Sequence, residues 1–502
     1  MSDPERKRET PSGMEKREVG QPLGVVFGNV GSSGFKAILK DRSVKEMDYI
    51  EVDHPDEGRL LCQVDDIELR SNLSPDGSMD EIKDRKVSWR RVAKIGVIGR
   101  RDGNKLRRPL TPVNPSSRLY RAQEDFIRDV LGLHREKGAY IGKIMHTEVD
   151  VILDPSKLVQ NHVSVVAKSG SGKSYTCGIL IEELCRISVP VVVLDLHGEY
   201  SSLVSPNIDQ DQYDMMDRFQ VTPEGLGDKV REFTFSEMDE GVTPLGVDLK
   251  GFRAEDLLEM MGIKNIGIGT SILYNAMVRV KEILGEDYDL SDLLAAVEAD
   301  HNPYKWNVVN GLQHLLSMPV FSSPRTPLKQ IVEPGYVSVI ELNNVSLDLQ
   351  QIGVTALLRR LFQARKEKVI PPFMLVVEEA HNFCPQSGPS VTSRVVRTIA
   401  SEGRKFGMGL TIVTQRPAKV DKNVLSQCGT QIIMKVTNPN DLKSVIASVE
   451  GLDSRMADEI QKLPVSVGIV VGGNISNPVL VEMRIRKTKH GGGAVDILGG
   501  IR

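Results

Sequence analysis

The residues best suited to bind a phosphate lie between positions 163 and 184. There the apolar run VSVVA leads into KSGSGKS and then into YTCGILIEEL, which has the spacing of a helix. Glycines let backbone N–H groups surround a phosphate, and a helix N-terminus adds partial positive charge. Lys173 suits the β- and γ-phosphates, and the Ser174 hydroxyl suits Mg²⁺. Strand, glycine-rich loop and helix in this order predict a phosphate loop for ATP.

The nucleotide-binding residues expected here are those of the loop and of the first helical turn. They are Ser169, Gly170, Ser171, Gly172, Lys173, Ser174 and Tyr175. Ala167 replaces the first glycine of the usual GxxxxGK[ST] pattern. This replacement is acceptable if the position keeps the ordinary dihedral angles of a strand end.

Two adjacent carboxylates end a second apolar run, FMLVVEEAH. We expect Glu378 to hold Mg²⁺ together with Ser174, and Glu379 to polarise the water that attacks the γ-phosphate. Adjacent carboxylates also occur at solvated helix starts. The order of the motifs along the chain favours the catalytic role.

A third pair of carboxylates, Asp195 and Glu199, follows the run VVVLD, whose strand we expect to neighbour that of the phosphate loop. A supporting role near the nucleotide is one interpretation. In the other, Asp195 caps a turn and Glu199 is exposed. The run LTIVTQRP ends another buried strand, and its Gln415 is the expected sensor of the γ-phosphate.

The segment VTSRVVRTIASEGRKFGMG has the spacing of an amphipathic helix, with Val391, Val395, Ile399 and Ala400 toward a sheet. Arg404 lies at its end, where a cation suits the helix dipole. The sharper hypothesis is an arginine finger that enters the ATP site of a neighbouring subunit.

These residues need a sheet whose strands end at one edge. Apolar β-branched runs recur at 163–167, 189–196, 336–342, 373–377, 410–414 and 430–436, with helical patterns between them. Continuous apolar runs of this kind form strands that are buried on both faces of a mainly parallel sheet. The sequence therefore predicts an α/β core over residues 146–485, with an acidic and then helical insertion at about 205–330.

The chain before this core has a different pattern. Residues 1–20 form a charged tail that we expect to be disordered, and residues 21–145 hold short β-prone runs that predict a small barrel or sandwich. Residues 83–108 contain eleven Lys and Arg against two acidic residues. This basic run is either a solvated face or a docking surface for DNA or a protein.

Composition narrows the class of protein. The 502 residues are 40% hydrophobic and 26% charged, as in globular proteins. The net charge is -3, so binding of nucleic acid would depend on local basic patches and not on the overall charge. The five cysteines form no CxxC pair, so we expect reduced thiols and no zinc site. Since no stretch approaches the ~18 apolar residues of a membrane span, we expect a cytoplasmic protein.

The motifs AKSGSGKS, VLDLHGEY, VVEEAH, EGRKFGMGLTIVTQRP and KTKHGGG, in this order, closely resemble the HerA family of hexameric DNA-translocating ATPases of archaea, in the FtsK/HerA group. The resemblance spans residues 21 to about 495. It implies a RecA-like core after a barrel like that of ATP-synthase subunits, assembled as a six-membered ring around double-stranded DNA. It also implies a NurA-type nuclease as partner, docked on the barrel.

The resemblance assigns roles to single residues as well. The Walker lysine falls on Lys173, the catalytic glutamate on Glu379, the sensor glutamine on Gln415 and the trans arginine on Arg404. The C-terminal segment 486–502, expected to reach a neighbouring subunit, brings His490 to the nucleotide.

The loops after two catalytic strands of RecA-like cores face nucleic acid. We therefore expect residues 382–394 and 416–425 to line the channel, with Arg394, Lys419 and Lys422 on DNA phosphates.

The function predicted from these residues and the resemblance is an ATP-driven double-stranded DNA translocase or helicase, with ATP and Mg²⁺ as cofactors. It would work with a nuclease in DNA end resection for recombinational repair. One alternative is a secretion or conjugation motor of the VirB4 kind, and another is a non-catalytic, nucleotide-gated scaffold for a nuclease. Retention of Lys173, Ser174, Glu379 and Arg404 speaks against an inactive motor.

Overall fold

The computed structural model of the 502-residue chain describes residues 20–71, 89–103, 105–133, 137–236, 241–249, 252–263, 266–285, 288–388, 390–449 and 454–492. Two compact units divide the chain, Met1–Leu131 and Gly132–Arg502. The expected boundary near residue 145 differs from this division because β8 (Ala139–Ile144) and β9 (Asp150–Leu153) pair with each other, and β8 pairs with a strand of the second unit. All but the last residue of the predicted 1–20 tail lies outside the described residues.

The first unit contains a closed β-barrel. Its strands are β1 (Gly24–Phe27), β2 (Gly34–Leu39), β3 (Tyr49–His54), β4 (Gly58–Ser71), β5 (Trp89–Asp102) and β7 (Arg118–Arg121). They follow the order β2-β1-β7-β3-β4-β5, and the pairing of β2 with β5 closes the ring. Inward side chains such as Ala37, Val52 and Ile95 are fully buried. β6 (Lys105–Arg107) pairs antiparallel with the end of β5, and α2 (Glu124–Leu131) ends the unit. The predicted barrel is confirmed.

Much of the basic run that the sequence places in this barrel is engaged within it. Arg91 donates to the carbonyls of Asp41 and Val44, at 2.7 Å each. The Arg100 guanidinium lies 2.7 Å from Glu57, and Arg107 pairs with a carboxylate next to its own hairpin turn. Lys83, Arg85 and Lys86 lie outside the described residues. These internal partners reduce the charge that the run presents to a ligand.

The second unit is built on one long sheet in the order β13-β12-β14-β11-β15-β16-β10-β17-β18-β19-β8-β9. Its central strands are β10 (Val163–Val166), β11 (Val191–Asp195), β14 (Val337–Glu341), β15 (Phe373–Val377), β16 (Met408–Thr414) and β17 (Thr430–Ile433). These run parallel, whereas β18 (Val467–Gly472) and β19 (Ile475–Met483) are antiparallel. The mainly parallel, buried sheet of a RecA-like P-loop core is confirmed.

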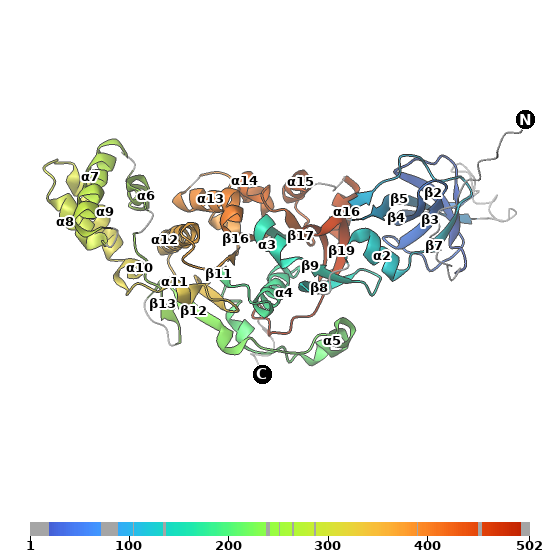
Figure 1. Cartoon of the computed structure of the whole chain (residues 1–502), viewed down its shortest axis with the longest axis horizontal. Helices are drawn as coiled ribbons and strands as arrows, with labels where there is room; N and C mark the ends of the chain where they lie inside the picture. The colour runs from blue at the N-terminus through green and yellow to red at the C-terminus, as the bar shows by residue number, and fades with distance from the viewer. Residues whose placement is uncertain are drawn as a thin grey trace, which may run out of the picture. The chain divides into compact units, whose positions relative to one another are not determined.

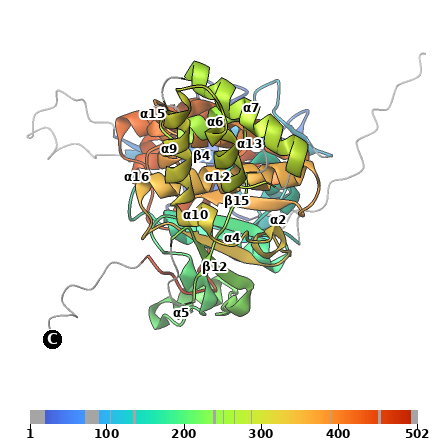
Figure 2. The ribbon, with the colours of Figure 1, turned by 90° about the vertical axis from the view of Figure 1, so that its left-hand side faces the viewer.

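Helices cover both faces of this sheet (Figure 1). Figures 1 and 2 show α12 (Leu347–Lys366) and α13 (Val391–Phe406) on one face and α4 (Lys173–Arg186) on the other. Val391, Val395, Ile399 and Ala400 of α13 are buried, as the amphipathic pattern predicts. The remaining core helices are α3 (Pro155–Asn161), α14 (Lys422–Leu425), α15 (Pro439–Ser448) and α16 (Ser454–Lys462).

The insertion between β11 and β14 is only partly helical. It begins with α5 (Tyr213–Phe219) and then adds two strands to the sheet, β12 (Val230–Thr234) and β13 (Thr243–Pro244). The helices follow: α6 (Ala254–Met260), α7 (Ile266–Leu284), α8 (Leu290–Glu298), α9 (Lys305–Leu316), α10 (Pro319–Ser322) and α11 (Leu328–Ile331). The predicted insertion at 205–330 therefore contains an extension of the sheet, because the β-prone run VREFT pairs with β14 along its whole length.

All five cysteines are free and buried. Within the part of the chain that the structure describes, no helix is both long and apolar enough to cross a membrane.

Candidate nucleotide site

The glycine-rich loop connects β10 to α4, as the motif predicts. Gly170 has φ +74° and Gly172 has φ +94°, a left-handed region that favours glycine, and Gly172 is the N-cap of α4. Ala167, in place of the first glycine, has a negative φ and is fully buried beside Thr414 of β16. The loop therefore needs glycine at two positions and tolerates alanine at the third.

Lys173 and Glu379 form an ion pair across the sheet edge. The Lys173 ammonium donates to Glu379 Oε1, and the two side chains are only 10% and 6% exposed. Glu379 is the second residue after β15 and adopts φ +43° and ψ +49°. This left-handed conformation costs a non-glycine residue about 1–3 kcal/mol and is typical of functional sites. This conformation places the Glu379 carboxylate beside Lys173, the first residue of α4.

Glu378 lies on a different side of the site from Glu379. Its Oε1 accepts from the Ser174 hydroxyl at 3.2 Å and lies 3.4 Å from the phenolic oxygen of Tyr200. Glu378 is fully buried, and burial raises its pKa to about 8 although Lys173 lowers it. A neighbouring cation would stabilise the charged form of a carboxylate that is buried in this position.

The donor set fits ATP with Mg²⁺. Three buried atoms at this site, Ser171 Oγ in the loop, Glu378 Oε2 and Glu379 Oε2, have no hydrogen-bond partner among the described residues. The first suits a phosphate oxygen, and the second suits Mg²⁺, which prefers oxygen ligands and keeps waters. No group of three or more His, Cys, Asp or Glu that could hold a metal lies in the described ranges. Ser174 and Glu378 would therefore hold Mg²⁺ together with phosphate and water.

Asp195 caps a turn, which is one of the two alternatives left open by the sequence. Its Oδ1 accepts from the backbone N–H groups of residues 197–199, at 2.9–3.3 Å, and its Oδ2 accepts from that of Tyr200 at 2.9 Å. Burial raises the pKa of Asp195 and the four N–H groups lower it. Glu199 is partly buried rather than exposed. The capped turn brings the Tyr200 phenol to Glu378, a role that sequence reasoning missed.

The strand that carries Asp195 does not neighbour the phosphate-loop strand, contrary to the sequence-based prediction. β10 lies between β16 and β17, whereas β11 lies between β14 and β15. Order along the chain misleads here because crossover connections place β15 and β16 between β11 and β10.

The C-terminal segment 484–492 lies on α4 of its own chain. Arg484 is fully buried and contacts Glu182 at 2.8 Å and Glu183 at 2.9 Å. Arg486 is equally buried against the same helix, where its guanidinium leaves no space for a side chain at position 178. Charged residues in an apolar helix pattern, Glu182 and Glu183, are the signal from which these buried pairs could have been predicted.

His490 lies at the end of this segment beside Tyr175, with ring centroids 5.4 Å apart. Burial and the charge of Arg486 lower the pKa of His490, and Glu199 raises it. Residues 486–492 thus bring His490 to the nucleotide-binding helix of the same chain. The rest of the predicted 486–502 segment lies outside the described residues.

Gln415 follows β16 at the same edge of the sheet as the phosphate loop. The register pairs Val166 with Thr414, so Gln415 lies beside the start of the loop. His381, which sequence reasoning also missed, has its Nδ1 3.3 Å from Glu379 Oε2 and 3.4 Å from Thr414 Oγ1. The motif EEAH, with a polar ring two residues after the carboxylate, is the signal that could have identified it.

Arg404 lies where the parallel strands begin, at the opposite end of the strands from the phosphate loop. It is exposed in the last turn of α13, whose Ala400 carbonyl lies 3.0 Å from His162 Nε2. His162 directly precedes β10, while the phosphate loop follows it. The length of β10 therefore separates Arg404 from its own phosphate loop.

The three predicted DNA contacts differ in their surroundings. Lys419 and Lys422 are both exposed in the segment that follows β16. Gln386, after β15, ties the two segments together: its N–H donates to the Lys419 carbonyl at 2.8 Å, and its Oε1 accepts from Lys422 N–H at 2.9 Å. Arg394 instead forms an ion pair with Glu259 of α6. A DNA phosphate would have to compete with that carboxylate for Arg394.

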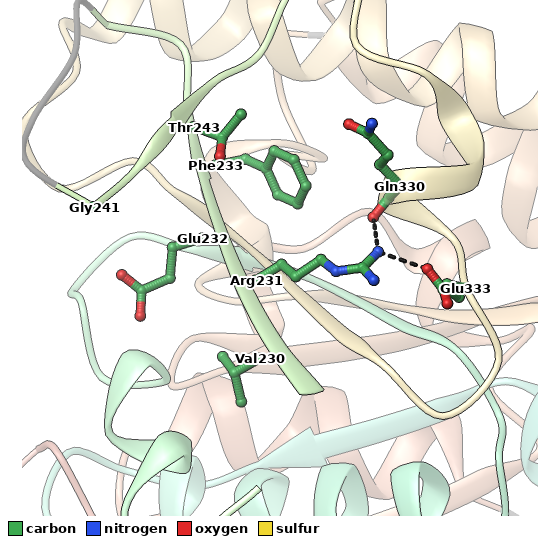
Figure 3. Close-up of a pocket in the computed structure, with 8 residues that line it drawn as sticks. All are labelled: Val230, Arg231, Glu232, Phe233, Gly241, Thr243, Gln330 and Glu333. Atoms are coloured by element: carbon green, nitrogen blue, oxygen red, sulfur yellow. Dashed lines mark hydrogen bonds and ion pairs between the residues drawn. The ribbon is translucent and has the colours of Figure 1, made fainter. Parts of the chain in front are cut away.

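A cavity of about 570 Å³ lies away from these residues, beside β12 (Figure 3). Arg231 spans part of it, where its guanidinium donates to the Gln330 carbonyl at 2.9 Å and pairs with Glu333 at 2.7 Å. None of the predicted site residues lines it. The edge of the sheet at the phosphate loop, not this cavity, is the candidate site.

Comparison with known proteins finds similarity to HerA and to related helicases. Residues 139–361 match a family model described as "Helicase HerA, central domain". A probable helicase of Methanocaldococcus jannaschii is 26% identical over 477 residues, which cover 90% of this chain and 89% of the relative. The DNA double-strand break repair helicase HerA of Pyrococcus furiosus is 26% identical, with 82% of this chain and 80% of that protein covered. Among solved structures, VirB4 of Thermoanaerobacter pseudethanolicus has 15% identity and a TM-score of 0.48, over 70% of this chain and 97% of VirB4.

Proposed function

We propose, from the premise that this chain belongs to the HerA family of P-loop ATPases, that it uses ATP hydrolysis to move along double-stranded DNA. The observation that carries the proposal is the meeting of Lys173, Ser174, Glu378 and Glu379 at one edge of a parallel sheet. Two adjacent carboxylates there have separate partners, as metal binding and water activation require.

The side chains divide the hydrolytic step between them. The loop amides and Ser171 bind the phosphates, and Lys173 leaves Glu379 to contact the β- and γ-phosphates. Glu379, released, orients the attacking water, and Gln415 contacts the γ-phosphate. Ser174 and Glu378 would hold Mg²⁺, and the bound ion would neutralise charge on the phosphate oxygens.

A ring of six subunits would complete the site. Because the whole of β10 separates Arg404 from its own phosphate loop, Arg404 can reach a γ-phosphate only in another subunit. The exposed Lys419 and Lys422 would contact DNA phosphates within the ring. We further propose that a NurA-type nuclease cuts the DNA that this motor supplies in end resection, in the cytoplasm.

The test is the rate of ATP hydrolysis measured without DNA, with linear double-stranded DNA, and with DNA plus a NurA-type nuclease. We expect hydrolysis to rise with double-stranded DNA and to couple to degradation of DNA ends when the nuclease is present. Lys173→Ala is the control for hydrolysis by this site. A rate that depends on Lys173 but does not respond to double-stranded DNA would refute the motor function while leaving the ATPase intact.

A further inference from the structure

His381 lies between the carboxylate that is proposed to activate water and the strand that leads to the DNA-facing loop. It belongs to the short helix η4 (Ala380–Asn382), which Glu379 begins. Its Nδ1 forms a hydrogen bond with Thr414 Oγ1 at 3.4 Å and lies 3.3 Å from Glu379 Oε2, a buried oxygen with no hydrogen-bond partner among the described residues. The ring is largely shielded from solvent. Thr414 Oγ1 in turn accepts from the N–H of Arg416 at 3.0 Å. A polar path thus runs from the catalytic carboxylate to the first residues after β16.

The proton on Nδ1 decides which neighbour His381 can hold. A carboxylate only accepts, so a bond to Glu379 needs a proton on Nδ1, and Thr414 Oγ1 can accept from the same N–H. Without that proton Nδ1 can only accept, so it holds the Thr414 hydroxyl and not Glu379. His381 therefore has two hydrogen-bonding states, one that can hold Glu379 and one that holds only β16.

The backbone ties the same two segments together. Pro385 and Val420 form an antiparallel bridge, Asp421 N–H donates to the Cys384 carbonyl at 2.9 Å, and Gln386 N–H donates to that of Lys419 at 2.8 Å. A displacement of the loop that carries Lys419 is thus transmitted to residues 384–386, a few residues from Glu379.

Charges on this loop also act on the ring. Burial lowers the pKa of His381, Glu379 raises it, and the positive charges of Arg416, Lys173 and Lys419 lower it further. A phosphate bound to Lys419 would offset part of that positive field.

We propose that His381 is a positioning residue that holds Glu379 in its water-activating orientation and makes that orientation depend on contact between DNA and the loop after β16. The contacts that carry this are the shared Nδ1, the Thr414–Arg416 bond and the paired loops 384–386 and 419–421. The coupling to DNA rests on the proposed motor function, whereas the positioning of Glu379 by His381 does not.

The test compares His381→Phe, which keeps an aromatic ring but no nitrogen, with His381→Asn, which keeps a donor near Nδ1. For each, kcat and KM for ATP are measured with and without saturating linear double-stranded DNA, and the Kd for a fluorescent ATP analogue is measured directly. We expect His381→Phe to lower the DNA-stimulated kcat about tenfold to a hundredfold, the cost of a misplaced catalytic group. KM and the analogue Kd should change less than about twofold to threefold, a difference small beside tenfold.

His381→Asn should recover part of the lost kcat, a rescue that a purely structural role for the ring would not give. Thr414→Val, which removes the hydroxyl from a fully buried side chain, should reduce the stimulation by DNA. Thr411→Val on the same buried strand is the matched control, and it should keep the stimulation of the wild type.

Two outcomes would overturn the proposal, and a third separates it from the motor function. If His381→Phe kept the wild-type kcat and stimulation, His381 would not position Glu379. If His381→Asn were as impaired as His381→Phe, the hydrogen bond would not be the cause. If the wild type itself showed no stimulation by DNA, the motor function and the coupling would fail, while the DNA-free kcat of the two variants would still decide the positioning role.

Discussion

Replacing Glu379 with glutamine should strengthen ATP binding at the same time as it stops turnover. Lys173 donates to the Glu379 carboxylate, and both side chains are almost buried. ATP needs the same ammonium for its phosphates, so nucleotide binding must first break this ion pair. Glutamine keeps the size of the side chain and one acceptor oxygen but removes the charge that competes for Lys173.

The expected size of the effect follows from the contact that is lost. A hydrogen bond to a charged group contributes about 1.5–3 kcal/mol. The Lys173 ammonium stays charged in Glu379→Gln and still donates to the amide oxygen, so only part of this contribution is lost. A loss of about 1 kcal/mol corresponds to a Kd for ATP roughly fivefold lower in Glu379→Gln. If Glu379 activates water as proposed, its loss should lower kcat by about 10²–10⁴-fold.

The assay is a titration with a fluorescent ATP analogue and Mg²⁺, paired with single-turnover hydrolysis. Glu333→Gln is the matched control, because Glu333 pairs with Arg231 beside β12, away from the phosphate loop. It should change the Kd less than about twofold, as expected for an exposed ion pair. An unchanged or weaker affinity in Glu379→Gln would refute the competition for Lys173. Near-normal turnover in Glu379→Gln, with loss of turnover in Glu199→Gln, would move the water-activating role to Glu199.

Three further predictions concern the ring, the DNA and the C-terminal segment. Subunits with Arg404→Ala and subunits with Glu379→Gln should each be inactive alone and recover part of the hydrolysis in mixed rings, and no recovery in rings confirmed by native mass spectrometry would favour the helix-dipole role. Lys419→Ala/Lys422→Ala should weaken DNA binding for all sequences and flatten its salt dependence, so an unchanged salt slope would contradict their placement. Arg484→Met should lower the thermal midpoint by several degrees, since breaking a buried ion pair costs about 3–5 kcal/mol, and a shift below about 1 °C would contradict the buried network.

The strands around the site are predictable from the sequence because their burial shows in their composition. β10, β11, β15 and β16 are buried along their whole length, and each is a run of mainly apolar residues. β12 cannot be predicted from its composition in this way. Its run VREFT is short and half-buried, and it becomes a strand through pairing with β14, about 100 residues further along the chain.

The side chains that support the site are less predictable, because their partners are distant in sequence. Charged residues are almost never fully buried unless they are paired, so Arg484 and Arg486 read as surface residues until Glu182 is placed beside them. Arg484 and Glu183 are 301 positions apart. Tyr200 likewise reaches Glu378 only after Asp195 caps the preceding turn.

The different surroundings of Glu378 and Glu379 follow from the backbone at the end of β15. In an extended strand, neighbouring side chains point to opposite faces of the sheet, and neither direction alone would bring both carboxylates to one phosphate loop. The left-handed conformation of Glu379 turns its carboxylate to Lys173 and His381, while Glu378 continues the strand toward Ser174 and Tyr200. Adjacent and chemically similar residues thereby have a cation on one side and hydroxyl groups on the other. The strained residue is therefore the feature that separates the carboxylate proposed to activate water from the one proposed to bind the metal, and a sequence motif of two glutamates does not reveal it.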